Sequence, residues 1–231
     1  MLGIDGLSAL DWAAFAWFLV GWLVYAAWAD RRRRRSTRYM ALYQQHHRAW
    51  LEQLMARERG IIDTHVIAAQ MRHITFYATT TILVLGGLVA LLGAADLGSK
   101  VLATLPFAVA PSPAFWTLKV AILLVVFASA FFKFTWALRL SYYKGVLISG
   151  APTKEAEAAE KDAFLARAEA LTALIAKHFL RGERAYYFGL AALGWFVNPW
   201  LFIATTTWVV AILHRRDFHS ATVRLLSKGS G

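Results

Sequence analysis

The chain contains no cysteine and is poor in charged residues. Without cysteine, the chain can supply no disulfide, no thiolate metal ligand and no thiol nucleophile. Charged residues make up 17% of the 231 positions, against about 25% in ordinary soluble domains, while apolar residues make up 58%. This composition argues against a soluble globular protein.

Three long runs lack charge altogether: 12–29, 74–95 and 185–213. A hydrocarbon core of about 30 Å needs about 20 apolar residues in a helix, which each run provides. A fourth apolar segment lies at 115–140. We therefore predict an all-α polytopic protein, a single membrane domain over 1–231, with about four transmembrane helices at 10–28, 74–92, 115–140 and 186–213. Gly229 to Gly231 are typical of an appended linker.

The basic residues flank these runs. Ten Lys and Arg lie in 30–73 and eight in 139–184, but only Lys100 lies between the second and third spans. The positive-inside bias therefore predicts an outer N-terminus and cytoplasmic long loops, and explains the net charge of +11 without nucleic acid as a partner. The first run is expected to stay uncleaved, because its arginines follow it.

The C-terminal tail fits this topology poorly. Four full crossings leave Arg215 and Arg216 outside. A re-entrant turn at Asn198-Pro199 would return them to the cytoplasm, but it leaves two halves of about 13 residues, roughly 20 Å each, short of a crossing. We therefore expect four crossings with a kink at Pro199.

Two amphipathic helical segments are expected in the cytoplasm, at about 37–73 and 153–181. In each, apolar or aromatic side chains recur at steps of three and four, the spacing of one helix face. The recurring positions are Met40, Tyr43, His47, Trp50 and Leu54 in the first segment, and Phe164, Ala168, Leu171, Ile175 and Phe179 in the second. We expect the second segment to pack on the first or to lie along the membrane.

Lys133 is the main candidate functional residue within the spans. Its stem can snorkel to the headgroups, as can that of Lys119 at the other end of the same span. Alternatively, Lys133 faces the bundle interior, where ionisable groups are expensive and usually functional. Asn198 is a further polar candidate at the proline break.

Small residues four apart on the second span, Gly86, Ala90 and Ala94, form a ridge that lets another helix approach closely.

The sequence shows no clear catalytic or metal-binding site. Apart from Asp11 at the outer end of the first span, the spans contain no Asp or Glu, and we assign no catalytic residue, cofactor or metal. Among the seven histidines, His73 with His178 would be the nucleus of any haem or metal site.

Three stretches together carry a family resemblance: GIIDTHVIAAQMRHITFYATTTILVLGGLVALLGA from Gly60, FWTLKVAILLVVFASAFFKFTWALRLSYY from Phe115, and KHFLRGERAYYFGLAALGWFVNPWLFIATTTWVVAILHRRDF from Lys177. In order and spacing they resemble the domain of unknown function 599 family, in its bacterial branch. The resemblance implies a helical protein of about four spans in the bacterial inner membrane. It transfers no residue of known role, but draws interest to Lys133, Arg184 and Asn198.

Three functions remain open. The first is a non-enzymatic membrane subunit or scaffold, homo-oligomeric or part of a larger complex. The second is a channel or transporter with an anion path along Lys119, Lys133 and Asn198, because a lysine lining without acids favours anions. The third is a subunit of a membrane redox or lipid enzyme.

Overall fold

The computed structural model describes residues 8–35, 37–56, 61–104 and 112–218, and these ranges contain helices and no strand. The first rod is α1 (Ala9–Leu19), a π-helical turn η1 (Val20–Val24) and α2 (Tyr25–Arg35). It is followed by α3 (Thr37–Ala56), α4 (Ile61–Leu92), the short α5 (Ala95–Ala103), α6 (Pro113–Ser149), α7 (Ala158–Ala192), α8 (Gly194–Val197) and α9 (Pro199–Phe218).

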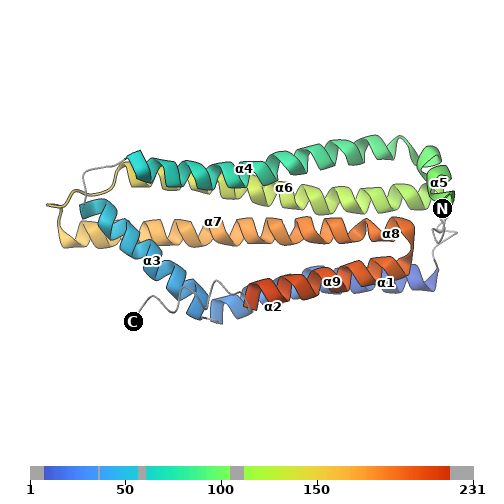
Figure 1. The fold of residues 1–231 in the computed structure, drawn as a ribbon, viewed down its shortest axis with the longest axis horizontal. Helices are drawn as coiled ribbons and strands as arrows, with labels where there is room; N and C mark the ends of the chain where they lie inside the picture. The colour runs from blue at the N-terminus through green and yellow to red at the C-terminus, as the bar shows by residue number, and fades with distance from the viewer. Residues whose placement is uncertain (1–7, 36, 57–60, 105–111, 219–231) are drawn as a thin grey trace.

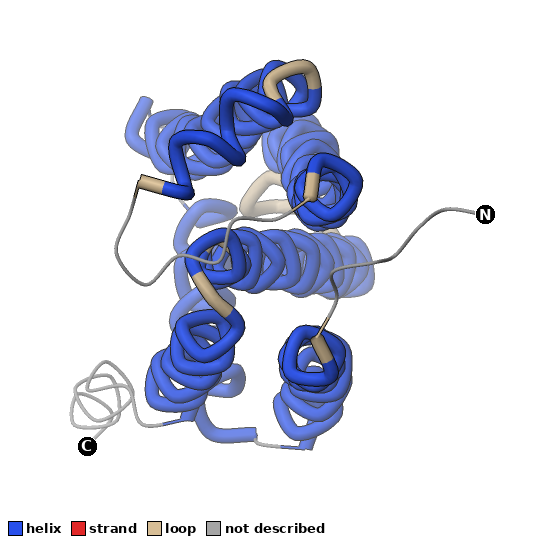
Figure 2. The backbone as a smooth tube through the Cα atoms, turned by 90° about the vertical axis from the view of Figure 1, so that its right-hand side faces the viewer, coloured by secondary structure: helices blue, strands red, loops and turns tan. Residues whose placement is uncertain are grey.

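The long helices run side by side along one axis (Figure 1). Helix α7 lies in the middle, with α4 and α6 on one side and α9 with the first rod on the other (Figures 1 and 2). We call the end that carries Arg31, α3 and the last turns of α6 the basic end. The end that carries α5, α8 and Trp195 is the Trp195 end.

Three stretches are long and apolar enough to cross a membrane: Ala9–Arg31, His65–Leu92 and Pro113–Ser149. Large apolar side chains on their outer faces are exposed, among them Leu83, Val125 and Phe132. A hydrocarbon environment accepts such a surface, whereas water does not. The predicted all-α polytopic architecture is confirmed.

The last predicted span differs from the structure. Residues 186–213 form the end of α7, the single turn of α8 and most of α9, and α9 runs back antiparallel to α7. The Thr205 hydroxyl donates to the Ala191 carbonyl across this hairpin at 2.8 Å. Helix α9 alone has 20 residues, about 30 Å at 1.5 Å per residue. The expectation of one kinked crossing was wrong, because the chain turns back at α8. Helix α9 is longer than the half-span of about 13 residues considered above, because it continues past Leu213 to Phe218.

The hairpin also changes where the end of α9 lies. Arg215 and Arg216 lie at the basic end, where the His214 ring stacks on Trp28, with 5.8 Å between ring centroids (Figure 1). Arg215 and Arg216 therefore no longer conflict with the positive-inside bias in this fold.

Beyond the spans, the basic end forms a helical core of its own. The buried residues of α3 pack against α7 and the end of α6, in a cluster of Leu51, Leu54, Met55, Ile148, Ala151, Phe164, Leu165 and Ala168. The two predicted amphipathic segments thus pack on each other. The N-terminal residues of the first segment fall partly outside the described side chains.

Helices α6 and α7 approach closely because α7 places glycine at the contact. A Cβ on Gly189 would lie 2.6 Å from the Phe127 ring, and one on Gly182 would lie 2.8 Å from the Phe134 ring. Both rings are buried. Aromatic rings of α6 therefore fill the space that the two missing side chains leave on α7.

Candidate functional site

A network of charged side chains crosses the bundle near the basic end of the spans. The Asp30 carboxylate of α2 accepts hydrogen bonds from two arginines of α7. Arg184 Nη2 donates to Oδ1 at 2.6 Å, and Arg181 Nε donates to Oδ2 at 2.6 Å. Arg184 is only 2% exposed and also donates to the carbonyls of Ala26 and Leu180. This guanidinium therefore joins the first rod to α7.

A second ion pair links α7 to α9 at the same level. Glu183 Oε2 lies 2.7 Å from Arg216 Nη1, and both side chains are mostly buried. Together, the Asp30 and Glu183 pairs connect α2, α7 and α9 into one charged layer. Isolated charges are costly in such surroundings, so pairing is what makes the layer stable.

Lys133 lies on α6, half-buried, on the side that faces this layer. Its Nζ donates to the Ser129 carbonyl one turn back in its own helix, at 3.1 Å. It is also within electrostatic range of Arg181 and His178 on α7. Lys133 therefore lies near enough to α7 for its charge to act on Arg181 and His178, at the edge of the apolar part of α6.

Lys119 is not a snorkelling lysine. Its side chain is only 3% exposed, and its Nζ donates to the Trp195 carbonyl at 2.7 Å. The ammonium also lies over the Phe115 ring, 4.2 Å from the centroid. The indole N–H of Trp195 in turn donates to Asp11 at 3.0 Å. Lys119 turns inward because α8 presents a carbonyl and aromatic rings to it.

Asn198 has a local structural role at the hairpin. Its side-chain oxygen accepts a hydrogen bond from the Leu201 backbone N–H at 2.7 Å, as an N-cap of α9. Pro199 follows as the first residue of α9, a position where its missing N–H costs nothing. The predicted break is thus a turn between two helices, and Asn198 caps the freed backbone.

The four predicted polar residues form two separate sites. Lys119 and Asn198 lie at the Trp195 end, whereas Lys133 and Arg184 lie at the charged layer. Lys133 is 14 residues from Lys119 along α6, about 21 Å at 1.5 Å per residue. Lys119 bonds the Trp195 carbonyl of α8, and Asn198 caps the start of α9. These contacts do not support the anion path along Lys119, Lys133 and Asn198.

Sequence reasoning missed the acids Asp11 and Asp30, which lie just at the ends of the first predicted span. A carboxylate directly before a run of five arginines was the available signal for Asp30. Sequence reasoning missed Lys144 as well. The available signal was its place in a series with helical spacing, all of whose members are buried in the structure: Ala137, Leu140, Lys144 and Ile148.

Lys144 connects the three helices of the basic end. Its Nζ lies 3.0 Å from His47 Nε2 of α3, and the Thr172 hydroxyl of α7 lies 3.3 Å from the same nitrogen. Burial, and then the Lys144 charge, lowers the pKa of His47 to about 4. The neutral His47 ring can therefore accept a hydrogen bond from the Lys144 ammonium at neutral pH.

The two histidines considered for a metal or haem nucleus contact different aromatic rings. The His73 ring packs against Phe179, whereas the His178 ring packs against Trp136. Within the described ranges, no three or more His, Asp or Glu side chains gather in a way that could hold a metal ion.

The predicted packing ridge faces away from the rest of the chain. Gly86 and Ala90 are exposed, Ala94 is half-buried, and a Cβ on Gly86 would meet nothing within 4 Å. The described part of the chain therefore leaves the central part of this ridge uncovered.

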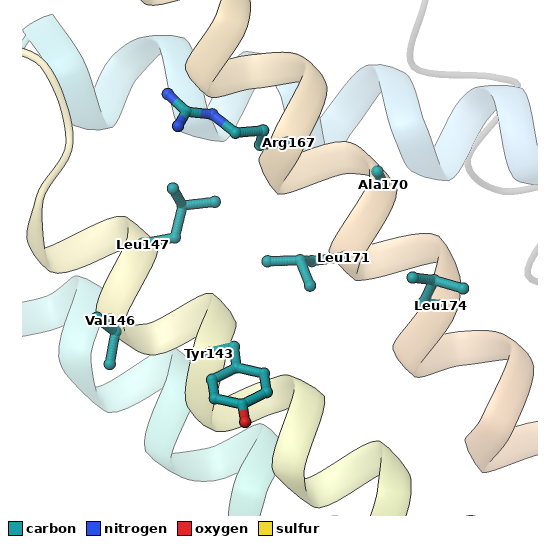
Figure 3. A pocket seen from close by; sticks show the side chains of 7 residues that line it. All are labelled: Tyr143, Val146, Leu147, Arg167, Ala170, Leu171 and Leu174. Atoms are coloured by element: carbon teal, nitrogen blue, oxygen red, sulfur yellow. The ribbon is translucent and has the colours of Figure 1, made fainter.

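An open groove of about 500 Å³ lies between α6 and α7 at the basic end (Figure 3). Its walls are mostly apolar and consist of Tyr143, Val146, Leu147, Ala170, Leu171 and Leu174, with Arg167 at the rim. The Arg167 Nε donates to the Ala163 carbonyl of its own helix. Such a groove offers apolar contact area with little polar recognition.

The fold and the charged layer define an all-α polytopic membrane protein whose extramembrane helices extend its spans. Residues 13–222 match the model of a family described as a protein of unknown function, DUF599, and the chain belongs to this family. The match confirms the resemblance seen in the sequence. No curated protein matches the chain, and no solved structure matches it.

Proposed function

We propose that the protein is a non-enzymatic scaffold or subunit of the bacterial inner membrane that self-associates through one face of α4. The observation that carries the proposal is an exposed stripe on α4 with small residues at its centre. Positions of this stripe follow steps of three and four, the spacing of a helix–helix seam, and all are exposed: Phe76, Thr79, Leu83, Gly86 and Ala90.

The use of glycine elsewhere in the bundle supports this reading. The space beside Gly182 and the space beside Gly189 are each filled by a phenylalanine ring of α6. Gly86 has the same small size, but in the described ranges no atom lies within 4 Å of a Cβ placed on it. Small residues in a span allow close approach of another helix, which gains packing contacts that lipid chains supply less well. A second copy of α4 is the partner that we propose.

The proposed orientation places the basic end in the cytoplasm. In this arrangement Arg31, Arg139, Arg167 and Arg215 all lie on the inner side, as the positive-inside bias favours. The helical core of α3, α6 and α7 would then face the cytoplasm and present the apolar groove to a partner subunit.

Cysteine cross-linking tests self-association cleanly, because the chain has no cysteine of its own. In native membranes, Ala90→Cys should form a disulfide-linked dimer on mild oxidation. Ala204→Cys, on the exposed face of α9 near the same end, is the matched control and should stay monomeric. Adding Gly86→Ile should reduce the Ala90→Cys dimer severalfold, whereas Ala204→Ile should not. Equal cross-linking at Ala90 and Ala204 would overturn the proposal.

A further inference from the structure

Lys133 of α6 and His178 and Arg181 of α7 lie within electrostatic range of one another beside the charged layer, where α6 packs on α7, and Lys177 precedes His178 in the sequence. Lys133 comes from α6, and Lys177, His178 and Arg181 come from successive turns of α7. His178 interacts electrostatically with all three of the others, and Lys133 interacts with Arg181. Burial, and then the charges of Lys177, Arg181 and Lys133, lowers the pKa of His178. We call this group the Lys133 cluster.

The acidic side chains near the Lys133 cluster are already paired with arginines. Both oxygens of Asp30 are bonded to Arg184 and Arg181, and Glu183 is paired with Arg216. In the part of the chain that the structure describes, neither Lys133 nor Lys177 forms an ion pair. Like charges brought together in a partly desolvated place repel one another, so a bound anion would stabilise the cluster.

The position of the Lys133 cluster along α6 matches the edge of a bilayer. Trp116, near the other end of the helix, is 17 residues from Lys133, about 26 Å at 1.5 Å per residue. That distance is close to the hydrocarbon thickness of about 30 Å. A bilayer whose other edge lies near Trp116 would therefore place Lys133 at the depth where lipid headgroups begin.

Apolar and aromatic surface adjoins the cluster on the same helix. Phe132 and Trp136 flank Lys133, and both are exposed. The Trp136 ring packs against the His178 ring of α7, with centroids 6.2 Å apart. Trp136 thus links the exposed apolar face of α6 to the charged groups of α7, and amphipathic indole rings favour this interfacial level.

We propose that Lys133, Lys177, His178 and Arg181 bind the phosphate of an anionic phospholipid, whose acyl chain lies along Phe132 and the outer face of α6. Phosphate oxygens accept charge-assisted hydrogen bonds from ammonium and guanidinium groups. Basic pockets between helices at a membrane surface bind anionic headgroups in the same way. The exposed apolar face distinguishes a lipid from a free phosphate ion, which would gain nothing from Phe132.

Binding of defined lipids to the purified full chain tests this site. The protein in zwitterionic detergent is titrated with dioleoylphosphatidylglycerol, with dioleoylphosphatidylcholine and with inorganic phosphate, and binding is followed by native mass spectrometry. Phosphatidylglycerol should bind more tightly than phosphatidylcholine. The double variant Lys133→Gln with Lys177→Gln should weaken phosphatidylglycerol binding by roughly thirtyfold, from about fivefold for each lysine near a charged headgroup.

Matched variants separate the site from total charge and from folding. Lys100→Gln with Lys154→Gln removes the same charge from exposed positions elsewhere and should leave binding unchanged. Lys133→Arg with Lys177→Arg should bind like the natural chain. If the double glutamine variant does not fold, Lys133→Gln and Lys177→Gln are measured singly. Each should weaken phosphatidylglycerol binding by about fivefold.

Three results would overturn the proposal. One is equal affinity for phosphatidylglycerol and phosphatidylcholine. Another is unchanged phosphatidylglycerol binding in the folded glutamine variants. The third is complete displacement of phosphatidylglycerol by inorganic phosphate, which would assign the Lys133 cluster to a free anion instead of a lipid.

Discussion

At the scale of single residues, Arg184 combines nearly complete burial with a full set of partners. Its guanidinium bonds Asp30 and two backbone carbonyls, one of them on the first rod. Arg181 bonds the same carboxylate, but its side chain is 37% exposed. The two arginines thus share an acid and differ mainly in how far water reaches them.

This difference predicts unequal costs of substitution. Arg184→Met should destabilise the fold by about 3 kcal/mol, because it leaves buried acceptors without their donor. Arg181→Met should cost less than about 1 kcal/mol, since an exposed ion pair is worth little. Reversible unfolding of both variants in mixed detergent micelles measures the difference in free energy. Equal losses would show that the burial of Arg184 is not what makes it important.

At the scale of helices, the contact between α6 and α7 depends on glycine in α7. The Phe127 ring lies where a Cβ on Gly189 would be, and the ring is itself buried. In α4, a Cβ on Gly87 would meet nothing within 4 Å. The same substitution should therefore have opposite effects in these two helices.

Gly189→Ala should destabilise the protein by about 1 to 3 kcal/mol, because the added methyl group forces Phe127 or the helices to move. Gly87→Ala should be neutral or stabilise by up to about 1 kcal/mol, since alanine favours the helix. Thermal unfolding followed by circular dichroism would compare the two. A tolerated Gly189→Ala, with no fall in stability relative to Gly87→Ala, would contradict the close contact.

At the scale of the whole molecule, the hairpin of α7 and α9 brings the basic residues at the end of α9 to the end of the bundle that carries Arg31. Helices α2 and α9 are far apart in the sequence, yet the end of α2 lies beside the end of α9 (Figure 1), so Arg31 and Arg215 come to the same end. Four full crossings would have placed them on opposite sides of the membrane. The side on which Arg215 lies therefore distinguishes the two topologies.

Single cysteines report that side directly, because the natural chain contains none. With a membrane-impermeant maleimide on intact spheroplasts, Ala9→Cys should be labelled. Arg215→Cys should be labelled only after the membrane is permeabilised, as should Thr153→Cys in the connection between α6 and α7. Labelling of Arg215→Cys in intact spheroplasts would restore the topology with four crossings.

The sequence alone determined the helical, membrane-spanning character of this protein. Charge-free runs such as 74–95 must satisfy their backbone hydrogen bonds within the segment when they lie in lipid, and a helix achieves this whatever its neighbours are. The stripes of the two amphipathic segments likewise predicted part of the faces that pack at the basic end, through Leu54, Phe164 and Ala168. These properties are local, so the order of residues is enough to reveal them.

Only the tertiary structure decided which polar groups meet and where the chain turns back. Asp30 and Arg184 are 154 positions apart, and nothing in the order of residues pairs them. Lys119 turns inward because α8 brings a carbonyl to it, and residues 193–198 become a hairpin because α9 packs against α7 and α1. A side chain's environment depends on partners from distant segments, and those partners are set by the packing of the whole bundle.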